Sequence, residues 1–173
     1  MVIQIDANDH TFHNSDHIFV DTNIWIYLFY PTNNNDYGYS SVFQNMLDKE
    51  VQFYTTEQVL SEYVNRIVQS EFVRFKDNQT RRVTYKQDFR PTSEYKDAYG
   101  MAMNSIHEDI LPIAKIVSLS SKEITACCEQ YQMLDFNDNL YLNLCVKNNF
   151  SIISHDRDFE NVNEEFILYR NIN

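Results

Sequence analysis

Short apolar segments that alternate with longer segments of helical periodicity constrain the fold of this chain most strongly. Five segments are predicted to be strands, at residues 18–20, 51–55, 116–119, 150–154 and 166–169. Helices are predicted at residues 22–30, 40–49, 56–72, 94–110, 121–130 and 138–148, although the β-branched and aromatic residues of 22–30 leave a strand open there. Such alternation indicates an α/β protein with a parallel sheet and helices on both of its faces.

Composition places the chain among globular proteins of one domain, residues 1–173. With 43% hydrophobic residues it can bury a core of ordinary size. No apolar run approaches the roughly 20 residues that span a bilayer, and the first residues lack the basic and apolar regions of a signal peptide. Three cysteines, two of them adjacent, favour a reducing compartment. We therefore expect no membrane association and a cytoplasmic location.

Two segments depart from the α/β pattern. Residues 1–17 form a polar arm whose Val2–Ile5 stretch either adds an edge strand or stays loose. Residues 74–96 form an insertion that holds most of the basic side chains, and most of it lacks helical periodicity. Between Arg66 and Lys96 lie eight basic and four acidic residues, a local balance of +4 in a chain of net charge −11.

The net charge of −11 alone argues against binding nucleic acid, because an acidic surface repels phosphates. A protein that is acidic overall can nevertheless present one basic face. The basic segment is therefore either a phosphate-binding face or a solvated, flexible loop. If it binds RNA, we expect contacts to phosphates rather than bases from three of its residues: Arg81, Arg82 and Lys86.

Acidic residues follow two of the predicted strands. Asp21 comes directly after the strand at 18–20, and Asp156 follows the strand at 150–154. Because ligands of parallel α/β sheets bind beyond the carboxyl ends of the strands, these two acids are expected on the same rim. Taken singly, each has a simpler structural role, since Asp21 can cap a helix and Asp156 can stabilise a turn.

Two further acids lie on predicted helices. Glu62 lies opposite the centre of the apolar stripe of its helix, where a merely solvated glutamate would also lie. Asp138 can interact with the dipole of its helix in the first turn, with Asp135 as the cap. No single acid therefore makes the case for a site, and the argument rests on the set.

The order of the acidic motifs resembles that of the PIN-domain nuclease family. The motifs are Ile-Phe-Val-Asp-Thr-Asn-Ile at 18–24, Val-Leu-Ser-Glu-Tyr at 59–63, Asp-Phe-Asn-Asp-Asn-Leu at 135–140 and Ile-Ser-His-Asp-Arg-Asp-Phe at 153–159. The first and last are fairly specific, and the glutamate motif is weak by itself. Two departures stand out: residue 154 is Ser where Thr is commoner, and segment 70–110 is longer than the smallest members need.

The resemblance implies a three-layer α/β/α sandwich around a central parallel five-stranded sheet. It also implies that Asp21, Glu62, Asp138 and Asp156 are the metal ligands and catalytic residues. Asp138 is preferred over Asp135 because the family's aspartate immediately precedes an apolar helical run.

The chemistry of four carboxylates suits a divalent cation. Converging carboxylates without positive partners raise one another's pKa values, and an ion with oxygen ligands, Mg²⁺ or Mn²⁺, removes that repulsion. Such an ion lowers the pKa of bound water and orients it for in-line attack on a phosphodiester. Behind the metal ligands we expect a supporting layer of Asn23, Ser154, Asp158 and Asp135. Asn23 and Ser154 are expected to orient water or phosphate, Asp135 to cap its helix, and Asp158 to cap the turn rather than join the rim.

The sequence therefore predicts a Mg²⁺- or Mn²⁺-dependent endoribonuclease. Many relatives are VapC-like toxins of toxin–antitoxin pairs, which implies an RNA substrate, a small antitoxin partner and a homodimer. The alternative from another class is a non-catalytic PIN-fold scaffold in an RNA-associated complex. A phosphatase with an aspartyl nucleophile is disfavoured, because Asn23 cannot supply the proton that a second aspartate gives in that chemistry.

The histidines add little to this prediction. His10, His13 and His17 have a spacing that a metal can use, but a chance cluster is the better interpretation than a zinc site. A general-base role is conceivable for His155, yet a solvent-facing loop histidine is preferred.

Overall fold

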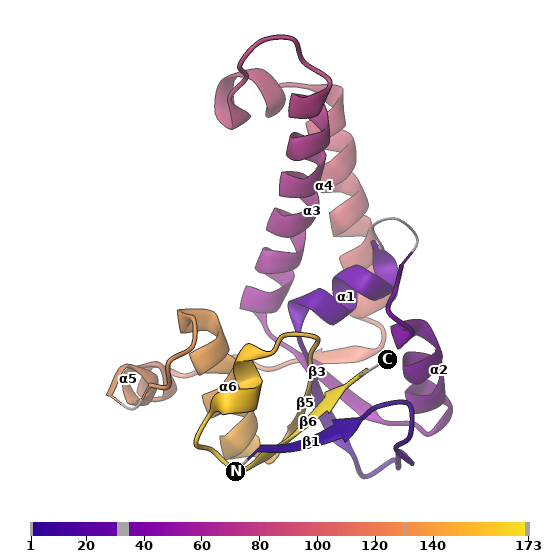
Figure 1. Ribbon diagram of the computed structural model, residues 1–173, viewed down its shortest axis with the longest axis vertical. Helices are drawn as coiled ribbons and strands as arrows, with labels where there is room; N and C mark the ends of the chain where they lie inside the picture. The colour runs from indigo at the N-terminus through magenta and orange to yellow at the C-terminus, as the bar shows by residue number, and fades with distance from the viewer. Residues whose placement is uncertain (1, 31–34, 130, 172–173) are drawn as a thin grey trace.

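A six-stranded parallel sheet forms the centre of the computed structural model, which describes residues 2–30, 35–129 and 131–171 (Figure 1). The strands are β1 (Val2–Asp6), β2 (His17–Val20), β3 (Gln52–Thr55), β4 (Ala114–Ile116), β5 (Ser151–Ile153) and β6 (Phe166–Arg170). Their order is β1-β6-β5-β2-β3-β4, and every neighbouring pair is parallel. The α/β prediction is confirmed, with one strand more than expected, because β1 pairs with β6 along its whole length.

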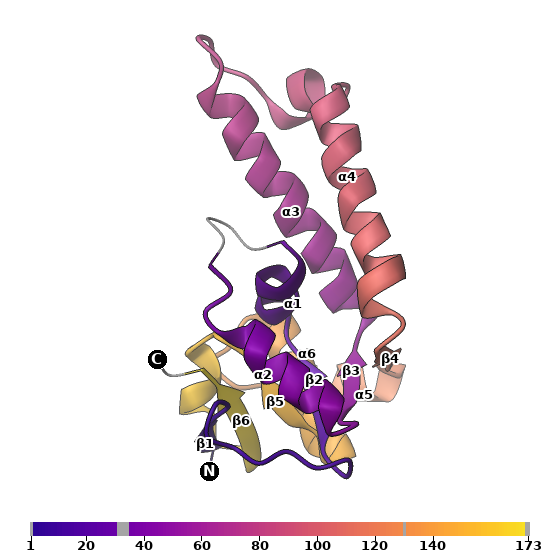
Figure 2. The ribbon, with the colours of Figure 1, turned by 90° about the vertical axis from the view of Figure 1, so that its right-hand side faces the viewer.

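Helices lie on both faces of this sheet. They are α1 (Thr22–Phe29), α2 (Tyr39–Asp48), α3 (Glu57–Asp77), α4 (Ser93–Ser105), α5 (Ser121–Glu129) and α6 (Phe136–Asn148). Figures 1 and 2 show α2 and α6 on opposite sides of the strands. Residues 22–29 are helical rather than extended, so the strand left open there does not form. Among the described residues, no helix combines the length and the apolar character that crossing a membrane requires.

The two central strands, β2 and β5, lie in the core and position the residues that follow them. All three apolar residues of β2, Ile18, Phe19 and Val20, are fully buried. Phe19 pairs in register with Ile152 of β5, and its ring lies 5.2 Å from the Tyr141 ring of α6. Because such tightly packed interiors hold their side chains in fixed positions, the residues that follow β2 and β5 leave the sheet from a rigid base.

The strand β4 differs from its predicted position at residues 116–119. It covers Ala114–Ile116, where Ala114 is buried and pairs with Phe53, whereas Ile116 is 45% exposed. Apolarity alone had favoured the later residues, but pairing with β3 selects the earlier ones. Edge strands are short and half solvated, so their sequence signal is weak.

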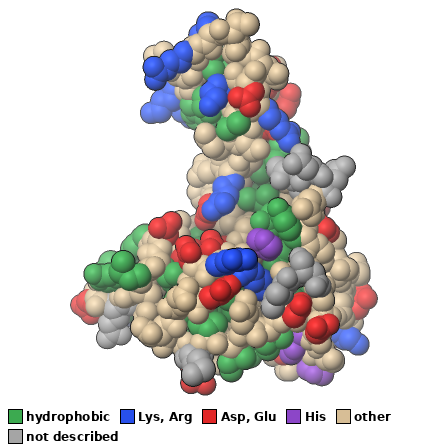
Figure 3. Space-filling model, in the orientation of Figure 1, with side chains coloured by type: hydrophobic (Ala, Val, Ile, Leu, Met, Phe, Trp, Pro, Cys, Tyr) green, Lys and Arg blue, Asp and Glu red, His purple; other side chains and the backbone are tan. Residues whose placement is uncertain are grey.

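Helices α3 and α4 form a hairpin that stands away from the sheet (Figures 1 and 2). The segment 74–96, predicted to be largely without periodicity, instead continues α3 to Asp77, forms a π-helical turn at Tyr85–Phe89 and enters α4 at Ser93. A second small core explains this order, because Phe89 is fully buried against aromatic side chains of both helices. The basic residues therefore sit on a folded tip, where Figure 3 shows Lys and Arg side chains gathered.

Candidate active site

Asp21 lies where the central strands β2 and β5 end. Its backbone N–H donates to the carbonyl of Ile153, and its side chain caps α1 by accepting from the N–H of Thr22 at 2.6 Å. The second carboxylate oxygen accepts from Asn23 Nδ2 and from Ser154 Oγ, both at 2.6 Å. Three donors thus fix the orientation of a carboxylate that is only 6% exposed.

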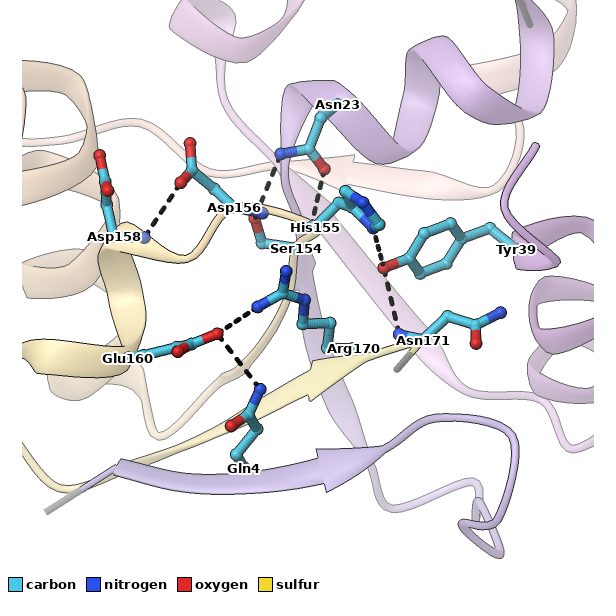
Figure 4. A network of polar contacts seen from close by, with 10 residues as sticks. All are labelled: Gln4, Asn23, Tyr39, Ser154, His155, Asp156, Asp158, Glu160, Arg170 and Asn171. Carbon is cyan, nitrogen blue, oxygen red and sulfur yellow. Dashed lines mark hydrogen bonds and ion pairs between the residues drawn. The ribbon is translucent and has the colours of Figure 1, made fainter. Parts of the chain in front are cut away.

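Asp156 lies in the turn after β5, which Figure 4 shows with Asn23, Ser154 and Asp158, and Ser154 links it to Asp21. The N–H of Asp156 donates to Ser154 Oγ at 2.9 Å, and that hydroxyl in turn donates to Asp21. Asn23 spans the same turn, because its amide nitrogen reaches Ser154 and its oxygen accepts the N–H of His155. The N–H of Asp158 donates to the Asp156 carboxylate at 3.0 Å and closes the turn.

Glu62 approaches from α3. Its Oε2 accepts from Thr22 Oγ1 at 3.1 Å, and its Oε1 accepts from Arg66 Nε at 2.8 Å and faces Arg66 Nη2 at 2.7 Å. The position opposite the apolar stripe is therefore not simply solvated, because α1 packs against this part of α3. Sequence reasoning places Arg66 only in the basic segment, although an acid four residues before an arginine on a helix predicts this pair.

Asp138 and Asp135 come from the start of α6. Asp135 occupies the N-cap position, but its side chain makes no capping hydrogen bond, and Asp138 lies in the first turn. All four acids line one cavity of about 290 Å³, whose wall comprises Asp21, Asn23, Glu62, Arg66, Asp135, Phe136, Asn137, Asp138, Asp156 and Asp158. The structure thus brings together the predicted metal ligands and three of the four predicted supporting residues, with Ser154 buried behind them.

Burial and nearby negative charges make two of these carboxylates, those of Asp21 and Asp138, hard to ionise. Burial, with smaller contributions from the charges of Glu62 and Asp156, raises the pKa of Asp21 to about 6 despite its hydrogen bonds. Burial also raises the pKa of Asp138 to about 7, helped by the charges of Asp21, Asp156, Glu62 and Asp135. A shared cation is the usual remedy for carboxylates that repel one another in this way.

The donor set of the cavity suits a hard divalent cation. Its acids offer only oxygen, which favours Mg²⁺ or Mn²⁺ over zinc or copper. Burial, together with the charges of Glu62, Asp21 and Asp138, raises the pKa of the nearby Tyr141 hydroxyl, so this group stays neutral beside the acids.

The acids are close enough to repel, but they are not yet arranged as a ligand set. Within residues 2–30, 35–129 and 131–171, no three His, Cys, Asp or Glu side chains are gathered tightly enough to hold an ion. The contacts of Glu62 give a physical reason, since Arg66 and Thr22 hold both of its oxygens. An ion held by these acids would therefore require their carboxylates to move closer together.

The predicted RNA-binding residues lie far from the acids. Arg81 pairs with Asp88 at 2.7 Å and also donates to the carbonyl of Arg82, and all three predicted side chains follow the end of α3. Fifteen residues separate Glu62 from Asp77, which is roughly 20 Å along a helix at 1.5 Å per residue. The hairpin therefore separates the basic residues at its tip from the acidic residues where it meets the sheet, as Figure 3 shows.

His155 was expected to face solvent, but it is half-buried and packs against tyrosines. Its ring packs against Tyr37 and Tyr39, with centroids at 4.8 and 5.9 Å, and a hydrogen bond of 3.2 Å joins its Nδ1 to Tyr39 Oη. Burial, together with the charges of Arg170 and Arg157, lowers the pKa of this histidine. The tyrosines come from a segment 116 residues or more away, so local sequence gave no sign of the cluster.

Comparisons with known proteins agree with this geometry. The profile of the PIN domain family matches residues 18–165. No curated protein matches the chain at a significant level. VapC20 of Mycobacterium tuberculosis, a toxin that cleaves the sarcin-ricin loop, is 14% identical with a TM-score of 0.52 over 83% of this chain and 92% of its own.

A second similar structure is VapBC2 of Rickettsia felis, solved with a DNA fragment of its promoter. It is 13% identical, with a TM-score of 0.53 over 88% of this chain and 98% of its own. At such low identity the two structures support the fold alone, whereas the family profile covers most of the sequence. This chain therefore belongs to the PIN domain family.

Proposed function

We propose that this protein is an endoribonuclease that depends on Mg²⁺ or Mn²⁺. The observation that carries the proposal is the single cavity lined by Asp21, Glu62, Asp138 and Asp156, which come from four separate segments of the chain. The pKa values of Asp21 and Asp138 are raised to about 6 and about 7, so it is unfavourable for all four acids to be ionised without a cation. An ion bound there would supply an activated water for attack on a phosphodiester.

The chain's own residues divide the remaining work. Asn23 and Ser154 donate hydrogen bonds to the Asp21 carboxylate and fix its orientation. Arg66 holds Glu62 and, 59% exposed, can exchange this partner for a phosphate oxygen when RNA enters. Asp158 closes the turn that carries Asp156, and we assign it a positioning role.

We further propose that the tip of the hairpin holds RNA through phosphate contacts from Arg81, Arg82 and Lys86. The charge separation supports this, because a body of net negative charge repels RNA except near a cation or a basic patch. At roughly 20 Å from Glu62, the tip would contact phosphates several nucleotides from the cleaved bond. These contacts would add affinity without sequence choice.

We also propose a cytoplasmic role as the toxin of a toxin–antitoxin pair, acting as a homodimer and held by a small antitoxin. The support is the similarity of the fold to one named toxin and to the toxin–antitoxin assembly VapBC2. The unpaired thiols of Cys127, Cys128 and Cys145 are compatible with a reducing compartment.

Cleavage of a labelled single-stranded RNA tests the nuclease proposal. We expect cleavage with Mg²⁺ or Mn²⁺ and none with chelator. Loss of a residue that only supports a metal ligand typically lowers activity by 10- to 100-fold. Asp156→Asn removes a proposed ligand itself and should lower the cleavage rate by more than this. The matched control is Asp97→Asn, which removes the same charge from an exposed position on α4 and should cleave normally.

Two outcomes would contradict the proposal. Cleavage that persists in chelator or in Asp156→Asn would place the chemistry elsewhere. A protein that binds Mn²⁺ but cleaves no RNA would instead fit the alternative of a non-catalytic scaffold.

A further inference from the structure

Four aromatic rings gather beside the acidic cavity. Tyr27 of α1 lies 4.7 Å from Tyr37 and 5.4 Å from His155, and it stacks on Tyr39 of α2 at 5.9 Å. Tyr39 is fully buried and forms the base of the cluster, whereas Tyr37 is 42% exposed and Tyr27 and His155 are half-buried. The cluster thus presents ring surface to solvent on a fixed support.

The support is built from hydrogen bonds that Figure 4 shows around His155. Tyr39 Oη accepts the buried N–H of Asn171 and is joined to His155 Nδ1. The N–H of His155 donates to Asn23 Oδ1, and Asn23 also donates to the Asp21 carboxylate. One continuous network therefore sets the position of the His155 ring relative to the acids.

Tyr37 is held in place at the expense of an unfavourable backbone. Its φ of 53° is left-handed, a region that bulky residues rarely adopt, and Gly38 follows with φ of 77°. The amide of Asn171 donates to the carbonyl of Tyr37, and a Cβ on Gly38 would lie only 2.5 Å from that amide nitrogen. Strain of this kind concentrates at functional sites, where the surrounding contacts must enforce it.

The cluster also adjoins the acids. Its Tyr27 hydroxyl interacts electrostatically with Asp21, Asp156 and Arg66, all of which line the acidic cavity. His155 immediately precedes Asp156 in the chain. A group stacked on these rings would therefore lie beside a phosphate held at the cavity.

The charges around the rings are mixed, because Arg66, Arg157 and Arg170 act on them together with Asp21 and Asp156. Arg66 and Arg170 are paired with Glu62 and Glu160, whereas Arg157 has no ion pair among the described residues. With an ion bound among the acids, as proposed above, Arg157 would attract the phosphates on either side of a base. Bases stack well on Tyr and His rings, and single-stranded RNA offers its bases unstacked.

We propose that Tyr27, Tyr37 and His155 form a stacking subsite for one nucleobase of the RNA, next to the phosphate at the acidic cavity. This inference rests on the proposed nuclease function and deepens it, because it assigns an unpaired nucleotide beside the cleaved bond. Stacking tolerates any base, so the subsite selects single-stranded RNA over a paired helix.

The test uses short single-stranded RNAs with the fluorescent base 2-aminopurine at one position each, mixed rapidly with the full chain and Mn²⁺. Fluorescence should be quenched at one position beside the cleaved bond. Tyr37→Ala should abolish that quenching and weaken binding by about 5- to 100-fold. Tyr37→Trp should keep both, and Tyr99→Ala, which removes a tyrosine of similar 44% exposure from α4, should change neither.

An RNA that lacks the base at the quenched position provides the second arm. It should bind the wild-type protein as weakly as Tyr37→Ala binds the intact RNA, and combining the two changes should cost nothing more. If the two changes weakened binding multiplicatively, or if Tyr37→Ala bound RNA with wild-type affinity, the subsite would be overturned. The proposed cleavage by the acids would not be affected.

Two further results would also overturn the inference. Tyr37-dependent binding of a short arginine peptide, without any effect of Tyr37 on RNA, would make the rings a protein-binding site. A wild-type protein that neither binds nor cleaves RNA would refute the nuclease proposal together with the subsite.

Discussion

Changing Asp21 to Asn should alter how the stability of the metal-free protein depends on pH. The pKa of Asp21 lies near 6 in the folded protein, against 3.8 without the fold, so ionisation of this residue opposes folding. The protonated Asp21 carboxyl contributes fully to stability below pH 3.8, and this contribution is lost as the pH rises through about 6. At roughly 1.4 kcal/mol per pKa unit the full loss is about 3 kcal/mol.

Between pH 5 and pH 8 the wild-type protein should lose roughly 1.5 kcal/mol of this contribution, because part is already lost at pH 5. Asp21→Asn cannot lose it. Asn forms weaker hydrogen bonds than Asp to Thr22 and Ser154, which lowers the stability of the variant by the same amount at both pH values. This loss therefore cancels when the two pH values are compared. The difference in Tm between variant and wild type should therefore move by about 3–6 °C in favour of the variant.

Thermal unfolding in chelator at pH 5 and pH 8 measures this difference, with Asp97→Asn as the exposed control. At pH 8, Mn²⁺ at 100 times its Kd should then restore about 2.7 kcal/mol to the wild-type protein and little to Asp21→Asn. A Tm difference that is the same at both pH values would refute the reasoning, because Asp21 would then be ionised without cost.

Three further predictions concern individual residues. Asp138→Asn should abolish RNA cleavage and Asp135→Asn should reduce it only mildly, and the reverse order in the rate assay would exchange their roles. Arg66→Gln should free Glu62 and tighten Mn²⁺ binding by roughly 2- to 10-fold in a titration while slowing cleavage, whereas weaker Mn²⁺ binding would count against the contact as a restraint. Three basic residues lie at the hairpin tip: Arg81, Arg82 and Lys86. Replacing all three by Ala should reduce the salt slope of RNA binding by roughly 2–3, and an unchanged slope would place the RNA path elsewhere.

The sequence predicted the central strands and the acids because both depend on local patterns. The short apolar segments before Asp21 and Asp156 are buried strands with strong signals, and parallel strands bring their carboxyl ends to one rim. Edge strands were harder to predict. The polarity around Val2–Ile5 allows either a strand or a loose arm where β1 forms, and β4 lies two residues earlier than expected.

Contacts between distant segments account for what the sequence left out. Segment 74–96 lacks periodicity over most of its length, since its fold depends on Phe89 packing between α3 and α4. His155 joins tyrosines of α1 and α2 through contacts that no local pattern encodes. The Arg66–Glu62 pair, by contrast, has a local signal, because its four-residue spacing on a helix predicts the contact.

Crystals of the protein grown with Mn²⁺ would test the central claim most directly, through anomalous scattering from the ion. The account predicts a peak inside the cavity of Asp21, Glu62, Asp138 and Asp156, with carboxylate oxygens as ligands and Glu62 released from Arg66. Crystals that bind Mn²⁺ only at other surfaces, or that leave this cavity without a peak at saturating Mn²⁺, would contradict it.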